Sequence, residues 1–171
     1  MRSEPHRTPD AAIAELAELS ELPEGVVRVR DGANGWGVTT IVTRKRDAEQ
    51  RDHQEEPCRR CPWRKDAPTG AFPPEVFQHS ATTSYDLAVS TFACHASSPG
   101  EPPLTCAGFL LRGAAHNLSI RLSSRDYSDV RTTIELYSDY VDMAVANGVP
   151  ADDPVLAPCR RDQYTGDRLE R

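Results

Sequence analysis

The chain has 171 residues and a mass of 18.9 kDa, which is enough for one domain with extensions. Hydrophobic residues make up 38% of it and aromatic residues 6%, so its core is expected to be thin and to need a stabilising metal or cross-link. The formal charge of -6 argues against a protein that coats nucleic acid by bulk positive charge, although a local basic patch remains open.

The N-terminal part predicts a helix followed by a hairpin. Thr8 suits an N-cap, Pro9 the first helical position and Asp10 the first turn, while Pro23 ends the helix. Its apolar face is expected to consist of Ile13, Leu16, Ala17 and Leu19. Two apolar runs joined by an Asp-, Asn- and Gly-rich turn predict a β-hairpin over residues 26–44.

The middle of the chain predicts short elements around the cysteines. Residues 44–56 are highly charged and predict an exposed helix or a flexible link. A short helix is expected over residues 75–80 and a short strand over residues 87–92. Another helix is expected to begin near Cys106 and to extend through Leu118.

A long amphipathic helix is predicted after this region, beginning near Ser123 or Ser124 and ending at Asn147-Gly148. Its apolar residues recur at steps of three and four: Tyr127, Val130, Ile134, Tyr137, Val141 and Ala144. A second strip, Leu136, Tyr140 and Met143, packs in the same domain or forms a seam with a protein partner or a second copy through the 126–147 helix.

These elements predict an α+β fold in three parts. Residues 1–50 form a helix and hairpin extension, residues 51–150 a cysteine-rich, metal-centred core with its C-terminal helix, and residues 151–171 a loosely held polar tail. No segment approaches the roughly 18–20 apolar residues of a membrane span, and no secretory signal is visible. Five cysteines in such a chain indicate metal or thiol chemistry in a reducing cytoplasm.

Four cysteines form the main functional signal: Cys58, Cys61, Cys94 and Cys106. The two residues between Cys58 and Cys61 allow one turn to direct both sulfurs at the same point. A knuckle, a strand end and a helix N-terminus commonly assemble four sulfurs around one ion. The four residues are therefore predicted to hold zinc or, alternatively, an iron–sulfur cluster, which the Cys61-Pro62 step resembles weakly.

Residues beside the cysteines leave several interpretations open. His95 is an alternative ligand to Cys94 or a group that contacts a ligand, because adjacent residues rarely bind one ion together. Cys159 is expected to be a free thiol. The basic patch around the knuckle contacts nucleic acid or, more simply, neutralises a thiolate-bound metal by donating to its sulfurs. This patch, with its one aromatic residue, consists of Arg59, Arg60, Trp63, Arg64 and Lys65.

Three segments carry a resemblance to a known family. They are Pro-Cys-Arg-Arg-Cys-Pro-Trp-Arg at 57–64, Phe-Ala-Cys-His at 92–95 and Cys-Ala-Gly at 106–108. Together they resemble a family of uncharacterised proteins from actinobacteria and their phages, over residues 57–125. The resemblance implies a cysteine-rich core and a source, and it implies no reaction.

Four functions compete at this point. The first is a small zinc-stabilised binding or regulatory module without catalytic activity, because no hydrolase, nucleotide-binding or zinc-protease motif stands out. The second is an iron–sulfur protein that senses redox state or carries electrons. The third is a thiol enzyme in which Cys58, beside Arg59 and Arg60, has a lowered pKa. The fourth is a nucleic-acid-binding regulator that uses the basic knuckle.

Overall fold

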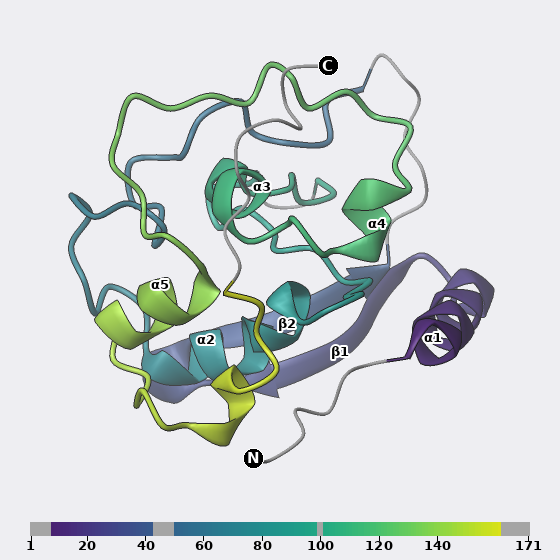
Figure 1. Cartoon of the computed structure of the whole chain (residues 1–171), viewed down its shortest axis with the longest axis horizontal. Coiled ribbons are helices and arrows are strands. Elements are labelled where there is room, and N and C mark those ends of the chain that lie inside the picture. The colour runs from purple at the N-terminus through teal and green to yellow at the C-terminus, as the bar shows by residue number, and fades with distance from the viewer. Residues whose placement is uncertain (1–7, 43–49, 99–100, 162–171) are drawn as a thin grey trace.

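Short helices and one β-hairpin make up the fold, and the α+β prediction is confirmed (Figure 1). The computed structural model describes residues 8–42, 50–98 and 101–161. Its helices and strands are α1 (Pro9–Glu21), β1 (Gly25–Asp31), β2 (Gly37–Val42), α2 (Pro74–Ser80), α3 (Ala107–Arg112), α4 (Leu118–Arg121) and α5 (Tyr140–Ala146). Short 3-10 turns lie at Ala33–Gly35, Ala81–Ser84 and Pro154–Leu156. No helix in the described part is both long and apolar enough to cross a membrane.

The predicted N-terminal helix and hairpin are both present. Thr8 caps α1, its hydroxyl accepting from the Ala11 amide at 3.3 Å, and Pro9 begins the helix. The expected apolar face is partly wrong, because the side chain of Ile13 is 60% exposed while Ala12 is buried. β1 and β2 pair antiparallel from Gly25 opposite Val42 to Asp31 opposite Gly37.

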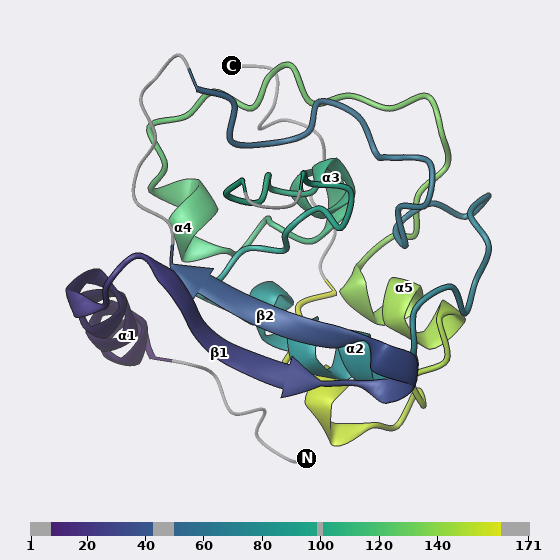
Figure 2. The same cartoon turned by 180° about the vertical axis from the view of Figure 1, so that it is seen from behind.

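The hairpin lies across one side of the core. α2 lies behind it and contacts β2, and α5 packs beside α2 (Figure 2). β2 alternates between half-buried and exposed residues, as expected for a strand with one covered face. The hairpin turn also reaches the core, where the ring of Trp36 meets that of Phe72 edge-on at 4.9 Å. The division into parts at residues 50 and 150 remains a prediction.

Trp63 is the centre of the core and has no exposed surface. Its indole ring meets the rings of Phe92, Phe109 and Tyr140 at centroid distances of 6.1, 6.4 and 5.8 Å. The Tyr140 hydroxyl donates to the Phe77 carbonyl at 2.7 Å, which satisfies a polar group that is fully buried. Trp63, which follows the Cys58–Cys61 knuckle, therefore joins α3, α5 and α2 in one cluster.

Gly108 of α3 and Gly113, the C-cap of that helix, make room for this indole. A Cβ added at Gly108 would lie 2.6 Å from the Trp63 Cβ, and one added at Gly113 would lie 2.5 Å from its Cη2. Real Cβ atoms do not approach side chains so closely, so any other residue at either position would push the ring and the helix apart. The Cys-Ala-Gly sequence at 106–108 thus combines a site cysteine with the surface on which Trp63 packs.

The prediction of a long C-terminal helix is wrong over most of the predicted length. α5 spans Tyr140–Ala146 only, and Asp139 caps it by accepting from the Asp142 amide at 2.9 Å. Residues 123–139 form no helix and run beside residues 50–64 (Figures 1 and 2). The Lys65 amide donates to the Glu135 carbonyl, and the Tyr137 amide donates to the Trp63 carbonyl. These bonds require extended backbone, so tertiary pairing overrides the helical spacing.

The second apolar strip is buried in the core of this chain. Leu136, Tyr140 and Met143 are all part of that core, which agrees with the alternative that they pack within the domain. No helix spans residues 126–139, and whether the protein binds a partner or a second copy of itself remains a prediction.

Three shorter predictions also need correction. No strand forms over residues 87–92, although Ala93 makes a single antiparallel bridge with Thr105. The helix after Cys106 ends at Arg112, and Leu118 begins α4 instead. Residues 50–56 are not helical, whereas residues 43–49 lie outside the described residues. The predicted loose tail is packed as far as Cys159, and residues 162–171 again lie outside the described residues.

Gly108→Ala is expected to lower the free energy of unfolding by about 2–3 kcal/mol, because the new methyl group overpacks against Trp63. Chemical denaturation monitored by circular dichroism measures the change. Arg112→Ala, an exposed position in the same helix, is the matched control and is expected to stay within about 0.5 kcal/mol of the wild type. Equal stability of the two variants would contradict the packing described here.

Candidate metal centre

Backbone hydrogen bonds hold the segments of Cys94 and Cys106 side by side. The Cys94 amide donates to the Leu104 carbonyl at 2.7 Å, and the Cys106 amide donates to the Phe92 carbonyl at 2.9 Å. On the other side of the Cys106 segment, the Thr105 amide donates to the Asp52 carbonyl at 2.8 Å. Three extended segments, although too short to count as strands, therefore align two of the cysteines.

The other two cysteines lie in a tight knuckle. The Cys61 amide donates to the Cys58 carbonyl at 3.0 Å, and the Arg64 amide donates to the Cys61 carbonyl at 3.1 Å. The two turns share Cys61, and Pro62 lies within the second turn. The Cys58 and Cys61 thiols interact, as the two-residue spacing predicts. Cys106 is the N-cap of α3, also as predicted.

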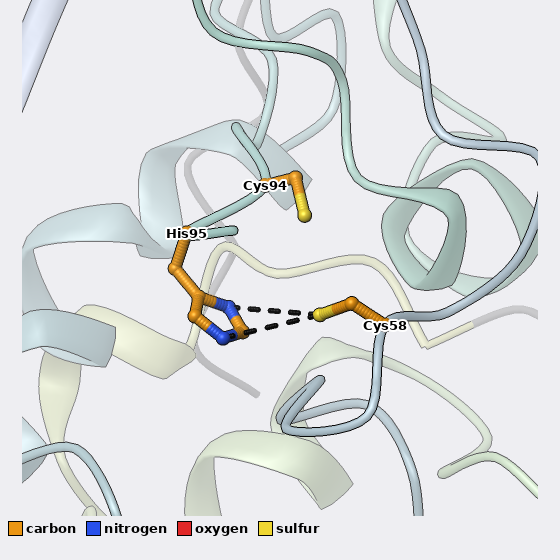
Figure 3. A group of neighbouring side chains, drawn as sticks. All are labelled: Cys58, Cys94 and His95. Atoms are coloured by element: carbon orange, nitrogen blue, oxygen red, sulfur yellow. Dashed lines mark hydrogen bonds between the residues drawn. The ribbon is translucent and has the colours of Figure 1, made fainter. Parts of the chain in front are cut away.

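The sulfurs form an inner pair and an outer group. The inner pair is Cys61 and Cys106, whose Sγ atoms are 3.7 Å apart. In the outer group, donor atoms of Cys58, Cys94 and His95 all lie within 4.8 Å of one another. Figure 3 shows the imidazole of His95 facing the Cys58 sulfur, which lies 3.9 Å from both of its ring nitrogens. The Cys58 thiol interacts with both Cys61 and Cys94 and so joins the two sets.

Burial separates these donors. Cys61, Cys94 and Cys106 are at most 4% exposed, whereas Cys58 is half-buried and His95 is exposed. The group that reaches solvent is therefore the outer one. His95 lies where an alternative ligand, or a neighbour of a ligand, would have to lie.

The pKa values of Cys58, Cys61 and Cys94 are raised, which favours the protonated form of these three thiols when no metal is bound. Interaction with Cys106, together with burial, raises the pKa of the Cys61 thiol, and interaction with Cys58 and burial raise the pKa of Cys94. The pKa of Cys58 is also raised, chiefly by its interaction with Cys61. The prediction of a lowered pKa at Cys58, which a thiol enzyme would need, is therefore wrong.

His95 differs from the thiols, because its ring is available as a neutral donor. Partial desolvation of the ring, followed by the positive charge of Arg60, lowers the pKa of His95, although the residue as a whole is exposed. A neutral imidazole is the form that binds metals. Phe72 meets the His95 ring edge-on at 4.9 Å and thereby places it beside the knuckle.

The donor set suits one small, soft ion. A tetrahedral zinc ion with Zn–S bonds of ~2.3 Å has sulfurs about 3.8 Å apart, and the Cys61–Cys106 distance of 3.7 Å is close to this value. In a [4Fe–4S] cluster each cysteine binds a different iron atom, which spreads the sulfurs further apart, whereas in a [2Fe–2S] cluster two cysteines share each iron atom. The cysteine and histidine group can thus bind a metal ion, and the inner pair has the spacing of ligands to a single ion.

The basic residues of the knuckle do not form the predicted nucleic-acid surface as a whole. Trp63 is fully buried, so the stacking role predicted for it is wrong. Arg64 forms an ion pair with Asp66 at 2.7 Å, and Lys65 forms one with Glu135 at 2.5 Å. These side chains are already engaged within the chain, and Arg64 also donates to the Cys58 carbonyl at 3.4 Å.

Arg59 and Arg60 remain exposed beside the site. The guanidinium of Arg60 lies over the Phe72 ring, 5.8 Å from its centroid. This position, next to Cys58 and His95, agrees with the predicted role of neutralising the charge of a thiolate-bound metal.

Two contributors were not singled out from the sequence. Phe72 joins Trp36 of the hairpin to His95 of the site. His53 is buried, and its ring nitrogens each lie 2.8 Å from a carboxylate oxygen, one of Asp52 and one of Asp129. This cluster ties the segment that supports Thr105 to residues 125–131. Phe72 lies in the family-like stretch after the knuckle, whereas no local pattern distinguishes His53.

Cys159 lies apart from the site. It is a free, buried thiol that donates to the Ala81 carbonyl at 3.7 Å. Burial, and then the charge of Asp139, raises the pKa of Cys159 to about 12. It is therefore a useful control cysteine.

Comparison with known proteins adds a family and no function. A family model described as a family of unknown function (DUF6283) matches residues 53–160. This range includes every residue of the site and all three segments that carry the resemblance noted above. No curated protein and no solved structure matches the chain. The actinobacterial or phage source remains a prediction.

Zinc binding to this protein is expected to release protons at neutral pH, because the raised pKa values keep the free thiols protonated and zinc binds thiolates. The apparent affinity should consequently rise with pH and fall on acidification. Isothermal titration calorimetry in buffers of different ionisation enthalpy measures the release. Binding enthalpies that do not depend on the buffer would contradict it.

Proposed function

The chain belongs to DUF6283, a family of unknown function, and we propose that its core is a cytoplasmic, zinc-stabilised binding or regulatory module without catalytic activity of its own. In this proposal one zinc ion is bound by the cysteines of the inner pair and the two outer cysteines, Cys58, Cys61, Cys94 and Cys106. His95 lies beside Cys58 as a neighbouring donor.

The observation that carries the proposal is the meeting of sulfurs from three separate segments. The inner pair has the spacing of two ligands to one zinc ion, and the outer group has three donors within 4.8 Å of one another. Buried thiols brought together in this way gain little from one another until a metal replaces their protons. A shared ion gives this arrangement a physical reason.

The architecture supports a stabilising role for the ion. Within residues 50–161, each α-helix has seven or fewer residues, and such short helices are marginal without tertiary packing. Structural zinc contributes on the order of 10–16 kcal/mol of apparent binding free energy in small domains. Zinc bound by these four residues would tie the knuckle to both extended segments and to α3.

An iron–sulfur protein is the alternative with the same four ligands. The Cys61-Pro62 step is its motivation, and the short inner sulfur–sulfur distance argues against a [4Fe–4S] cluster, in which each cysteine binds its own iron atom. A cluster would make the purified protein brown, with visible absorption lost on oxidation. Zinc would leave it colourless.

Elemental analysis of the full chain is expected to find about one zinc per molecule and no iron. Cys106→Ser should lose most of this zinc and melt at a markedly lower temperature, because it removes a buried ligand that begins α3. Chelation of the wild-type protein should lower its melting temperature in the same direction.

Cys159→Ser is the matched control, because Cys159 is buried like Cys106 but donates a hydrogen bond to the Ala81 carbonyl. It is expected to keep a full zinc content. A metal-free wild-type protein whose melting does not respond to chelators would overturn the proposed function, and a brown protein that contains iron would favour the alternative.

A further inference from the structure

The outer edge of the site exposes one sulfur of the four. Cys58 is half-buried, whereas Cys61, Cys94 and Cys106 have almost no accessible surface. An oxidant that diffuses from solvent therefore meets Cys58 first. Cys159, although also a thiol, is buried in another part of the core.

The same sulfur has a second thiol within reach. The Sγ atoms of Cys58 and Cys94 lie within 4.8 Å of each other, and the two thiols interact. The inner pair, Cys61 and Cys106, is close as well but is sealed from solvent. Cys58 also interacts with the Cys61 thiol, but Cys61 has Cys106 as a second neighbouring thiol at 3.7 Å, whereas the thiol that interacts with Cys94 is that of Cys58. The exposed sulfur and the thiol that depends on it therefore form the outer pair.

The surroundings of Cys58 also favour reaction there. Its neighbours Arg59 and Arg60 are exposed, and their positive charge lies beside the thiolate that a bound metal leaves at Cys58. Zinc binding converts the protonated thiol into a thiolate, which is the nucleophilic form of cysteine. The metal-loaded site therefore presents Cys58 to solvent as a thiolate.

We propose that Cys58 is an oxidation site, at which peroxide joins it to Cys94 in a disulfide and releases the zinc ion. This inference rests on the proposed function, because it concerns the metal-loaded site. It makes the module responsive to hydrogen peroxide.

The chemistry balances as two displacements. The Cys58 thiolate attacks one peroxide oxygen, the O–O bond breaks, and hydroxide leaves, so that Cys58 becomes a sulfenic acid. The Cys94 thiolate then attacks that sulfur, the S–S bond forms, and the S–O bond breaks with loss of a second hydroxide. Solvent protonates both hydroxides. Two thiolates thus lose two electrons, one peroxide becomes two waters, and zinc loses two ligands.

The test uses the full chain loaded with zinc and exposed to hydrogen peroxide, with a chromophoric zinc chelator as the reporter. About one zinc should be released for each disulfide formed, and peptide mass mapping should place the first disulfide between Cys58 and Cys94. Mapping that finds a Cys58–Cys61 disulfide, a Cys61–Cys106 disulfide or an oxidised Cys159 first would overturn the proposal.

Cys58→His provides the kinetic test, because histidine can still bind zinc but cannot form a disulfide. Zinc release from this variant should proceed at roughly a tenth of the wild-type rate or slower at the same peroxide concentration, because the accessible thiolate is gone. Release at the wild-type rate would contradict the role of Cys58. Cys159→Ser is the control and should behave as the wild type.

The two failures are distinguishable. A wild-type protein that contains no zinc before peroxide is added overturns the proposed function. A wild-type protein that contains zinc and keeps it in peroxide overturns this inference alone. If Cys58→His does not retain zinc, the order of disulfide formation in the wild-type protein still decides.

Discussion

The convergence of four cysteines from three distant segments is the constraint on which the rest of this structure depends. The knuckle at 58–61, the extended segment that ends at Cys94 and the start of α3 at Cys106 meet although few regular elements connect them. The hairpin of β1 and β2 lies outside this arrangement and covers one side of it. With short helices and a thin core, the chain has few other ways to fix the relative positions of these segments.

Trp63 couples this arrangement to the hydrophobic core. It follows the knuckle by two residues, it packs against Gly108 two residues after Cys106, and its backbone carbonyl accepts from the Tyr137 amide. A change in the knuckle is therefore transmitted directly to α3 and to the extended segment before α5. In this account, metal binding and core packing stabilise the same set of contacts.

The sequence predicts those features that depend on nearby residues. The cap of α1 at Thr8, the turn of the hairpin and the knuckle follow from local chemistry, and the structure brings together cysteines that the spacing alone could only suggest. The prediction of a helix over residues 123–147 is wrong because the spacing of apolar residues does not show which other segment the backbone pairs with. Residues 63–65 offer Glu135 and Tyr137 backbone partners, and Asp139 caps a shorter helix.

The remaining contributors to the site depend on long-range contacts. Phe72 beside His95, and His53 between two carboxylates, acquire their roles only when segments far apart in the chain meet.

X-ray absorption at the zinc edge of the purified protein tests the central claim most directly. The account predicts a single shell of four sulfur ligands at ~2.3 Å. A first shell of mostly oxygen or nitrogen ligands would contradict it.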